Sequence, residues 1–239
     1  MKDKLFSGAS APEKFEFNEN VARVFDDMLE RSIPHYRESQ EMVVDWCARF
    51  ARKDSNLYDL GCSTGVMLLR VASALSEVPQ ARLIGIDNSV PMLNKARENL
   101  KDVKTPWELV HADLDGDFSL TNASVVVMNY TLQFIVPERR QLLLGKILKG
   151  LLPNGCLLLT EKVLGDTPEL DAAFVEIHHQ FKRERGYSEL EISRKREALE
   201  NVLTPLKLHE NIELLKQAGF SNVDVFFKWN NFAGIIALP

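Results

Sequence analysis

The sequence predicts an α/β fold in which helices cover both faces of one mostly parallel sheet. From residue 56 onward, short apolar runs alternate with helical patterns, which is typical of consecutive β and α units. The run at 125–128 is apolar at every position, as expected for a strand that is buried on both faces. A chain of 239 residues, 45% of them hydrophobic, is long and apolar enough for one large domain.

Each element follows from a local pattern. Residues 19–51 are predicted to form two helices separated at Ser32-Ile33-Pro34, because proline cannot continue a helix. The apolar runs predict seven strands, at 56–62, 82–87, 107–113, 123–130, 155–162, 224–229 and 232–239. Helices are expected near 65–77, 90–101 and 137–150, and over most of 167–218. Asn230 and Asn231 form a short link typical of a hairpin, so one end of the sheet is expected to be antiparallel.

The chain is expected to be a single domain, residues 1–239, with four parts. These are an N-terminal helical cap (1–52), a Rossmann-like core (53–166), a helical insert (167–207) and a C-terminal helix with the hairpin (208–239). The cap and the insert are additions to the core. They are expected to cover the carboxyl ends of the strands, where ligands bind in such sheets.

Composition narrows the class of protein. The net charge of −5 is unsuited to binding nucleic acid over a broad face, because such binding depends on neutralising phosphates. Three cysteines without a CxxC motif do not predict a disulfide framework or a zinc site, and a reducing compartment is expected. The sequence shows no signal-peptide pattern and no apolar run of about 18 residues, so a cytoplasmic location without membrane contact is expected.

A glycine turn follows the first predicted strand, in the sequence YDLGCSTG. Asp87 ends the second strand, 22 residues after Gly65. This arrangement is typical of nucleotide binding, because an acid at that position accepts hydrogen bonds from ribose hydroxyls. A dinucleotide fingerprint needs glycine at 61, 63 and 66, but Ser63 and Val66 occupy two of these positions. The turn therefore favours a cofactor without phosphates, such as S-adenosylmethionine (SAM), over NAD or FAD.

Polar residues also end the next two strands. Asp113 is placed to accept a hydrogen bond from an adenine amino group, and Asn129 lies at the same rim. Asp and Asn favour turns in any case, so each residue alone is also explained as an ordinary turn residue. Together with the glycine turn and Asp87, the set resembles the class I SAM-dependent methyltransferase fold, a three-layer Rossmann-like architecture.

The charged segment 182–203 interrupts this alternation. Ser188 and Glu191 form a capping box, which predicts that a helix begins at residue 189. Its apolar residues follow helical spacing and are Ile192, Leu199, Val202 and Leu203. Arg196 falls inside this stripe, so it is predicted to face inward, where a charge needs an anionic partner. A structural ion pair with a nearby Glu, or a side chain that reaches out to solvent, remains an alternative.

Over nearly its full length, the chain resembles the carboxy-S-adenosyl-L-methionine synthases of tRNA wobble-uridine modification. The matching segments are NVARVFDDMLERSIPHY, YDLGCS, IGIDNS, NASVVVMNYTLQF, LLPNG, HHQFKRERGYSELEISRKREALENVL and FFKWNNFAGIIAL. The charged insert is the most diagnostic of these, because ordinary methyltransferases lack it. Two segments depart from the family pattern, at Thr64–Met67 and at ADL (112–114).

The resemblance implies a homodimeric transferase of one-carbon groups that converts SAM and prephenate into carboxy-SAM and phenylpyruvate. The carboxy-SAM is then handed to a separate tRNA carboxymethyltransferase, which forms 5-oxyacetyluridine at the wobble position. In this chemistry the acidic sulfonium methyl group forms an ylide that traps the carbon dioxide leaving prephenate. No protein nucleophile is needed, but a closed pocket is.

The resemblance also implies which residues contact the ligand. The set comprises Tyr36, Gly61, Cys62, Ser63, Asp87, Asn88, Asp113, Leu114, Asn129 and Arg196. Residues 61–63 cradle the methionine part, 87–88 bind the ribose and 113–114 border the adenine. Tyr36 reaches the ligand from the cap, and Arg196 has the catalytic role of pairing with the new carboxylate.

Two other functions stay open. A conventional methyltransferase acting on a small molecule or tRNA would use the same cofactor residues without Arg196 at the sulfonium. A SAM-binding module without catalysis would bind SAM and turn over nothing. No metal is expected, because the adjacent His178 and His179 point in different directions on a helix. Cys62 is expected to be selected for size rather than reactivity.

Overall fold

The sheet is assembled from strands that are distant in sequence. In the computed structural model, which describes residues 2–8, 14–75 and 80–239, the strand order is β3-β2-β1-β4-β5-β8-β7, and β6 pairs with β5 off this path. The strands are β1 (Asn56–Leu60), β2 (Arg82–Asp87), β3 (Trp107–His111), β4 (Ala123–Asn129), β5 (Leu151–Leu164), β6 (Leu206–Lys207), β7 (Asn222–Trp229) and β8 (Phe232–Leu238). Strands β1 to β5 are parallel, whereas β8 runs antiparallel to both β5 and β7. The predicted fold class and its antiparallel hairpin are confirmed.

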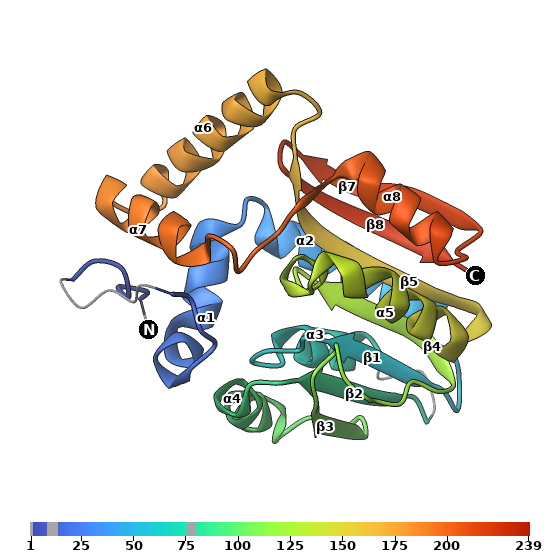
Figure 1. The fold of residues 1–239 in the computed structure, drawn as a ribbon. Helices are drawn as coiled ribbons and strands as arrows, with labels where there is room; N and C mark the ends of the chain where they lie inside the picture. Colours follow the sequence, from blue (N-terminus) through green and yellow to red (C-terminus); the bar gives the residue numbers. More distant parts are fainter. Residues whose placement is uncertain (1, 9–13, 76–79) are drawn as a thin grey trace.

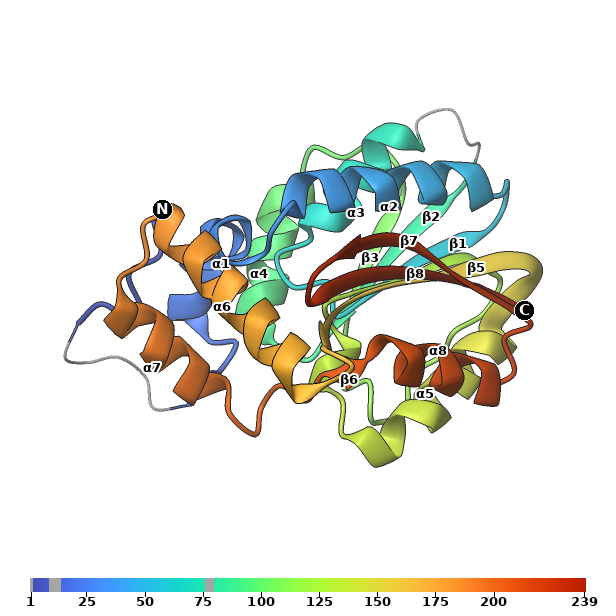
Figure 2. The same cartoon turned by 90° about the horizontal axis from the view of Figure 1, so that it is seen from above.

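Helices cover the two faces of the sheet, as Figure 2 shows from above. The helices are α1 (Glu19–Ser32), α2 (Tyr36–Phe50), α3 (Val66–Ala74), α4 (Val90–Leu100), η1 (Leu132–Phe134), α5 (Pro137–Gly150), α6 (Pro168–Glu184), α7 (Glu189–Leu199) and α8 (Leu208–Gln217). One buried cluster joins the sheet to α2, α3 and α4, and includes Cys47 and Leu68. A second joins the opposite face to α5 and α8, and includes Leu144 and Leu215.

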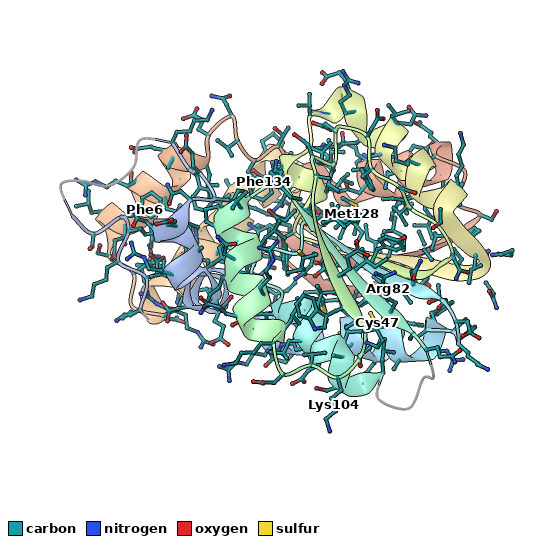
Figure 3. All side chains as sticks on the ribbon, turned by 90° about the horizontal axis from the view of Figure 1, so that it is seen from below. Phe6, Cys47, Arg82, Lys104, Met128 and Phe134 are labelled. Carbon is teal, nitrogen blue, oxygen red and sulfur yellow. The ribbon has the colours of Figure 1, made fainter. Side chains whose placement is uncertain are left out.

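A cap stands apart from these layers and consists of α1, α6, α7 and the N-terminal segment (Figure 1). Arg31 of α1 ties it together, because its side chain donates to the carbonyls of Arg185 and Asp3 at 2.9 and 3.0 Å. The Tyr187 hydroxyl donates to Asp3 Oδ2 at 2.6 Å. Figure 3 shows Phe6, 1% exposed, inside this cap and Met128 inside the sheet. The two ends of the cap are therefore fixed to each other by buried polar contacts.

Several element boundaries differ from those the sequence predicts. Strand β5 begins at Leu151 rather than 155, because Leu151 pairs with Ala123 before a register shift. Helix α3 ends at Ala74; residues 76–77 of the predicted helix lie outside the described residues. The two-residue strand β6 was not predicted. In the part of the chain described, no helix combines the length and apolar composition needed to cross a membrane.

The helix predicted from residue 189 begins there, and its capping box is present. The apolar stripe predicted for this helix was wrong beyond Leu199, because the backbone at Glu200 is extended and ends the helix. The buried face of α7 carries Ile192, Lys195 and Ala198. The buried face predicted with the help of Val202 and Leu203 is therefore rotated about the helix axis, because those two residues lie outside the helix.

Candidate active site

A cavity of about 860 Å³ lies between the carboxyl ends of the strands and the cap. All ten residues expected to contact a ligand line it: Tyr36, Gly61, Cys62, Ser63, Asp87, Asn88, Asp113, Leu114, Asn129 and Arg196. These residues come from four strand ends, α2 and α7, so the fold brings together positions that are far apart in the sequence. Their assignment to particular parts of a ligand remains a prediction.

The glycine turn is shaped by close packing. Gly61 has φ of +75°, and a Cβ there would lie 2.5 Å from Thr131 Oγ1, so glycine is needed for both conformation and space. Its N–H donates to the Ile86 carbonyl at 2.7 Å. Cys62 Sγ would lie 2.8 Å from a Cβ on Gly85, and burial raises the pKa of the thiol well above its ordinary value. The structure therefore fits Cys62 as a space-filling residue with little thiolate.

Asp87 is held in place by backbone donors. Its Oδ2 accepts from Ser63 N at 2.9 Å and its Oδ1 accepts from Ser89 N at 2.8 Å. Burial raises the pKa of Asp87, but the two backbone donors favour the ionised form. A carboxylate offers about four acceptor sites, so backbone donors leave Asp87 capacity to accept from a ligand hydroxyl. This geometry suits a ribose, as the sequence predicts.

Asp59 begins the glycine-turn motif, but the sequence analysis did not assign it a contact with the ligand. Its side chain lines the cavity and is 1% exposed, and within the described residues neither carboxylate oxygen has a hydrogen-bond partner. Burial, and then the charge of Asp87, raise the pKa of Asp59 to about 7. An orphaned buried carboxylate is costly unless a cation reaches it. Its position inside YDLGCSTG was the available signal, because that turn begins with an acid.

The rim of the cavity is more open. Asp113 is exposed, and its Oδ1 accepts from Asp115 N at 3.0 Å, while Leu114 is buried behind it. The Asn88 carbonyl lies 3.0 Å from His111 Nε2. Together these residues form a polar edge above an apolar floor, which suits a planar base.

Asn129 and Tyr36 are held by contacts between the core and α2. The Asn129 amide makes two hydrogen bonds of 3.0 Å with Gln40, and Thr160 donates to its Oδ1 at 2.5 Å. Tyr36, at the start of α2, is buried with its ring 6.4 Å from that of Tyr130. Gln40 was missed because nothing local in the sequence of α2 marks it as the partner of Asn129.

Arg196 lines the cavity, but it does not lie on the buried face of α7. Arg196 is exposed. The buried cation of α7 is Lys195, which is 7% exposed and donates to Ser32 Oγ at 2.8 Å. Arg196 therefore faces the cavity with Leu199, as the predicted stripe implies, but the face of α7 that packs against the rest of the cap is one residue away, at Lys195. Within the described residues, no acidic side chain pairs with Arg196.

The cavity therefore has two chemically different sides. Strands β1 and β2 supply Asp59 and Asp87 on one side. The other side carries Lys162 of β5, the cap cations Lys182, Lys195 and Arg196, and one acid, Glu200. SAM fits the acidic side, because its ammonium and sulfonium groups are cations and its ribose offers hydroxyl donors. A pyrophosphate would meet two buried carboxylates there, which disfavours a dinucleotide. Among the described residues, no group of His, Cys, Asp and Glu side chains is arranged to hold a metal ion.

Comparisons with known proteins agree with this geometry. The family model of the methyltransferase domain matches residues 57–155. Among solved structures, the SAM-dependent methyltransferase SibL and a putative O-methyltransferase from Nostoc punctiforme superpose with TM-scores of 0.62 at 17% identity, over 92% of this chain. The chain spans about three-fifths of the length of those two proteins, at 58% and 60%. These likenesses show the fold.

Curated relatives match over the whole chain. A carboxy-S-adenosyl-L-methionine synthase from Methylococcus capsulatus is 47% identical, with 99% of each chain covered. Proteins of the same name from Helicobacter hepaticus and Sulfurimonas denitrificans are 44% and 43% identical, with 99% and 100% of each chain covered. Full-length identity at this level, on a methyltransferase fold with the charged insert in place, shows that the chain belongs to the carboxy-S-adenosyl-L-methionine synthase family.

Proposed function

We propose that this chain is a carboxy-SAM synthase that converts SAM and prephenate into carboxy-SAM and phenylpyruvate. The observation that carries the proposal is Arg196, a cation in the cavity wall without an acidic partner among the described residues. SAM on the acidic side would place its sulfonium in the same cavity as this guanidinium. A methyl donor alone gives no reason for a cation there, whereas a carboxylate formed on the methyl group does.

The chemistry balances without a protein nucleophile. Prephenate loses its ring carboxylate as carbon dioxide and its ring hydroxyl as hydroxide, which makes the ring aromatic and leaves phenylpyruvate. The hydroxide takes one proton from the sulfonium methyl group of SAM and becomes water. The methyl carbon then forms a bond to carbon dioxide, which gives the carboxylate of carboxy-SAM. Dianionic prephenate and cationic SAM thus give anionic phenylpyruvate, neutral carboxy-SAM and water.

The residues of the cavity would then have distinct roles. Asp59 would accept hydrogen bonds from the SAM ammonium group, and Asp87 would hold the ribose. Arg196 would stabilise the carboxylate as it forms, an electrostatic role that is worth about 10²–10³ in kcat at comparable sites. The cap would keep water from the reacting carbon, because α1, α6 and α7 close the cavity above the strands.

The wider setting follows from the same proposal. Carboxy-SAM would pass to a separate tRNA carboxymethyltransferase that completes 5-oxyacetyluridine at the wobble position. This chain would act as a cytoplasmic homodimer on small molecules without binding tRNA itself. Its net charge of −5 supports that part, because tRNA binding depends on neutralising phosphates.

Mass spectrometry tests the proposal directly. The purified protein is incubated with SAM, with and without prephenate, and the small molecules are released by denaturation. The expected product is heavier than SAM by one carbon dioxide, depends on prephenate, and falls about 10²-fold or more in Arg196→Ala. If prephenate changes nothing and only SAM or S-adenosylhomocysteine appears, the proposal fails and a conventional methyltransferase becomes the better explanation. Lys53→Ala, on an exposed turn and outside the cavity lining, serves as the control.

A further inference from the structure

Two lysines of the cavity wall carry charges that the SAM site does not use. Lys162 lies on β5 in register with Phe232 of β8, and Lys182 lies in the last turn of α6. Both side chains line the cavity and are half-buried. Within residues 2–8, 14–75 and 80–239, neither lysine forms an ion pair. Cations withdrawn from water without an anion are costly, so their placement needs a reason.

The acids near these lysines, Asp171 and Glu200, form no ion pair with either of them among the described residues. Lys195 is also cationic and is bonded to Ser32 Oγ, and His178 Nε2 lies 2.7 Å from the Ser32 carbonyl. Burial lowers the pKa of Lys182 well below its ordinary value, and the charges of Lys195 and Lys162 lower it further. The charge of Asp171 favours the protonated form of Lys162, but Asp171 is turned toward the backbone, where its Oδ1 accepts from Gly165 N at 2.8 Å. The wall therefore has a surplus of positive charge facing the cavity.

A structural role at the helix end does not account for Lys182. Cations are favourable in the last turn of a helix. Arg183 already fills that role on the outer face of α6, where it pairs with Glu189 at 3.0 Å. The neighbouring cation is therefore exposed and paired, whereas Lys182 faces the cavity with its charge unpaired among the described residues. That contrast points to a ligand with negative charge.

SAM is a poor candidate, because it is a cation overall and its one carboxylate lies beside the ammonium group that Asp59 would hold on the acidic side of the cavity. We infer that Lys162 and Lys182 bind a carboxylate of the dianionic co-substrate, and that it is the carboxylate which stays in the product. The identity of this co-substrate rests on the proposed function, whereas the need for an anion rests on the wall itself. The volume of about 860 Å³ lies near the upper end of the range of about 300–1,000 Å³ for ligand pockets, which leaves room for both molecules.

The choice between the two carboxylates of prephenate follows from the direction of the reaction. The ring carboxylate disperses its charge as it leaves, so two fixed cations beside it would stabilise the ground state more than the transition state. The side-chain carboxylate keeps its charge throughout, so binding it fixes the substrate without slowing the chemistry. Lys162 and Lys182 would then act as positioning residues that direct the ring carboxylate toward the sulfonium methyl group.

Equilibrium binding of two acids tests this inference. Calorimetry measures the Kd of prephenate and of phenylpyruvate, with S-adenosylhomocysteine bound, for the wild type, Lys162→Met and Lys182→Met. Methionine keeps most of the side-chain length and removes the charge. Both acids are expected to bind at least about tenfold more weakly in each variant, which is about 1.4 kcal/mol. The Kd of SAM is expected to change less than about twofold. Arg183→Met, one residue along α6 and outside the cavity lining, is the matched control and is expected to bind like the wild type.

The outcomes separate the inference from a structural role and from the proposed function. A structural lysine would lower the melting temperature when replaced, whereas an unpaired ligand-binding lysine would leave it unchanged or raise it. Wild-type affinity for phenylpyruvate in both variants, or no binding of either acid by the wild type, overturns the inference. Loss of prephenate binding alone would assign the lysines to the leaving carboxylate and also overturn it. If both acids bind through the lysines but no carboxy-SAM forms, the proposed function fails and the anion site stands.

Discussion

Replacing Asp59 with Asn separates ligand binding from folding at one buried position. Asn keeps the shape of the side chain and removes its charge. Burial and the charge of Asp87 raise the pKa of Asp59 from its ordinary 3.8 to about 7. One pKa unit corresponds to about 1.4 kcal/mol, so the ionised carboxylate costs the ligand-free fold about 4 kcal/mol. The buried amide of Asn would itself lack partners, at about 1–3 kcal/mol. The net stabilisation expected from Asp59→Asn at pH 8 is therefore about 1–3 kcal/mol.

The direction of this stability effect can be checked by its dependence on pH. An acid whose pKa is raised on folding contributes stability that is present below its unfolded pKa of 3.8 and lost as the pH rises through about 7. The stability advantage of the Asp59→Asn variant over the wild type is therefore expected to grow between about pH 4 and pH 8. Urea unfolding of the ligand-free wild type and Asp59→Asn across that range measures it. Asp102→Asn, at an exposed position, is the control and should show no such trend.

The same substitution should weaken SAM binding. A hydrogen bond to a charged group contributes about 1.5–3 kcal/mol, so the Kd of SAM at pH 8 is expected to rise about tenfold or more. Calorimetry on the two proteins measures this directly. A stability difference between the wild type and Asp59→Asn that does not change with pH would refute the assignment of Asp59 as a buried carboxylate that binds the cation of SAM. Unaltered affinity for SAM would refute it as well.

Two further substitutions test the turn beside Asp59. Gly61→Ala is expected to destabilise the fold by about 1–3 kcal/mol, because a Cβ there meets Thr131 and the backbone has positive φ. Urea unfolding measures it, and Gly145→Ala, where a Cβ meets nothing within 4 Å, should be tolerated. Cys62→Ser is expected to retain carboxy-SAM formation within about tenfold, since the raised pKa leaves little thiolate. Rapid loss of activity on mild alkylation of the folded wild type at Cys62 would contradict that view.

Local patterns were enough to predict most of the fold. Strand β2 and helix α5 have the predicted boundaries, because an apolar run between polar ends and a proline at the first helical turn are local signals. The end of α7 was not predictable in this way. Leu199 is followed by apolar residues at helical spacing, but the backbone turns at Glu200 to bring Thr204 N to the Gln133 carbonyl at 2.9 Å. A contact between distant segments decided that boundary.

The site residues also differ in whether a local sequence signal reveals them. Asp87 was predictable because a strand end after a glycine turn is a local signal, and the resemblance to a known family added Arg196 and Tyr36. Lys162 and Lys182 were not found, because each is ordinary in its own segment and only the fold shows that both face one cavity. A surplus of charge in one cavity depends on which distant segments the fold brings together, and the spacing of residues in the sequence does not show this.

The cap also has a consequence for the order in which the chain is made. The hydrogen bond from Arg31 to the carbonyl of Arg185 cannot form until Arg185 is made, 154 residues later in the chain. At about 5–20 residues per second, that interval lasts roughly 8–30 s during synthesis. Helix α1 therefore leaves the ribosome long before α6 and α7. Its apolar contact with Met92 of α4 can form early, whereas the contact with Ala198 of α7 forms late. The cap is completed after residues 53–166 but before β7 and β8, so a nascent chain stalled before α6 would lack both the cap helices α6 and α7 and the last two strands of the sheet.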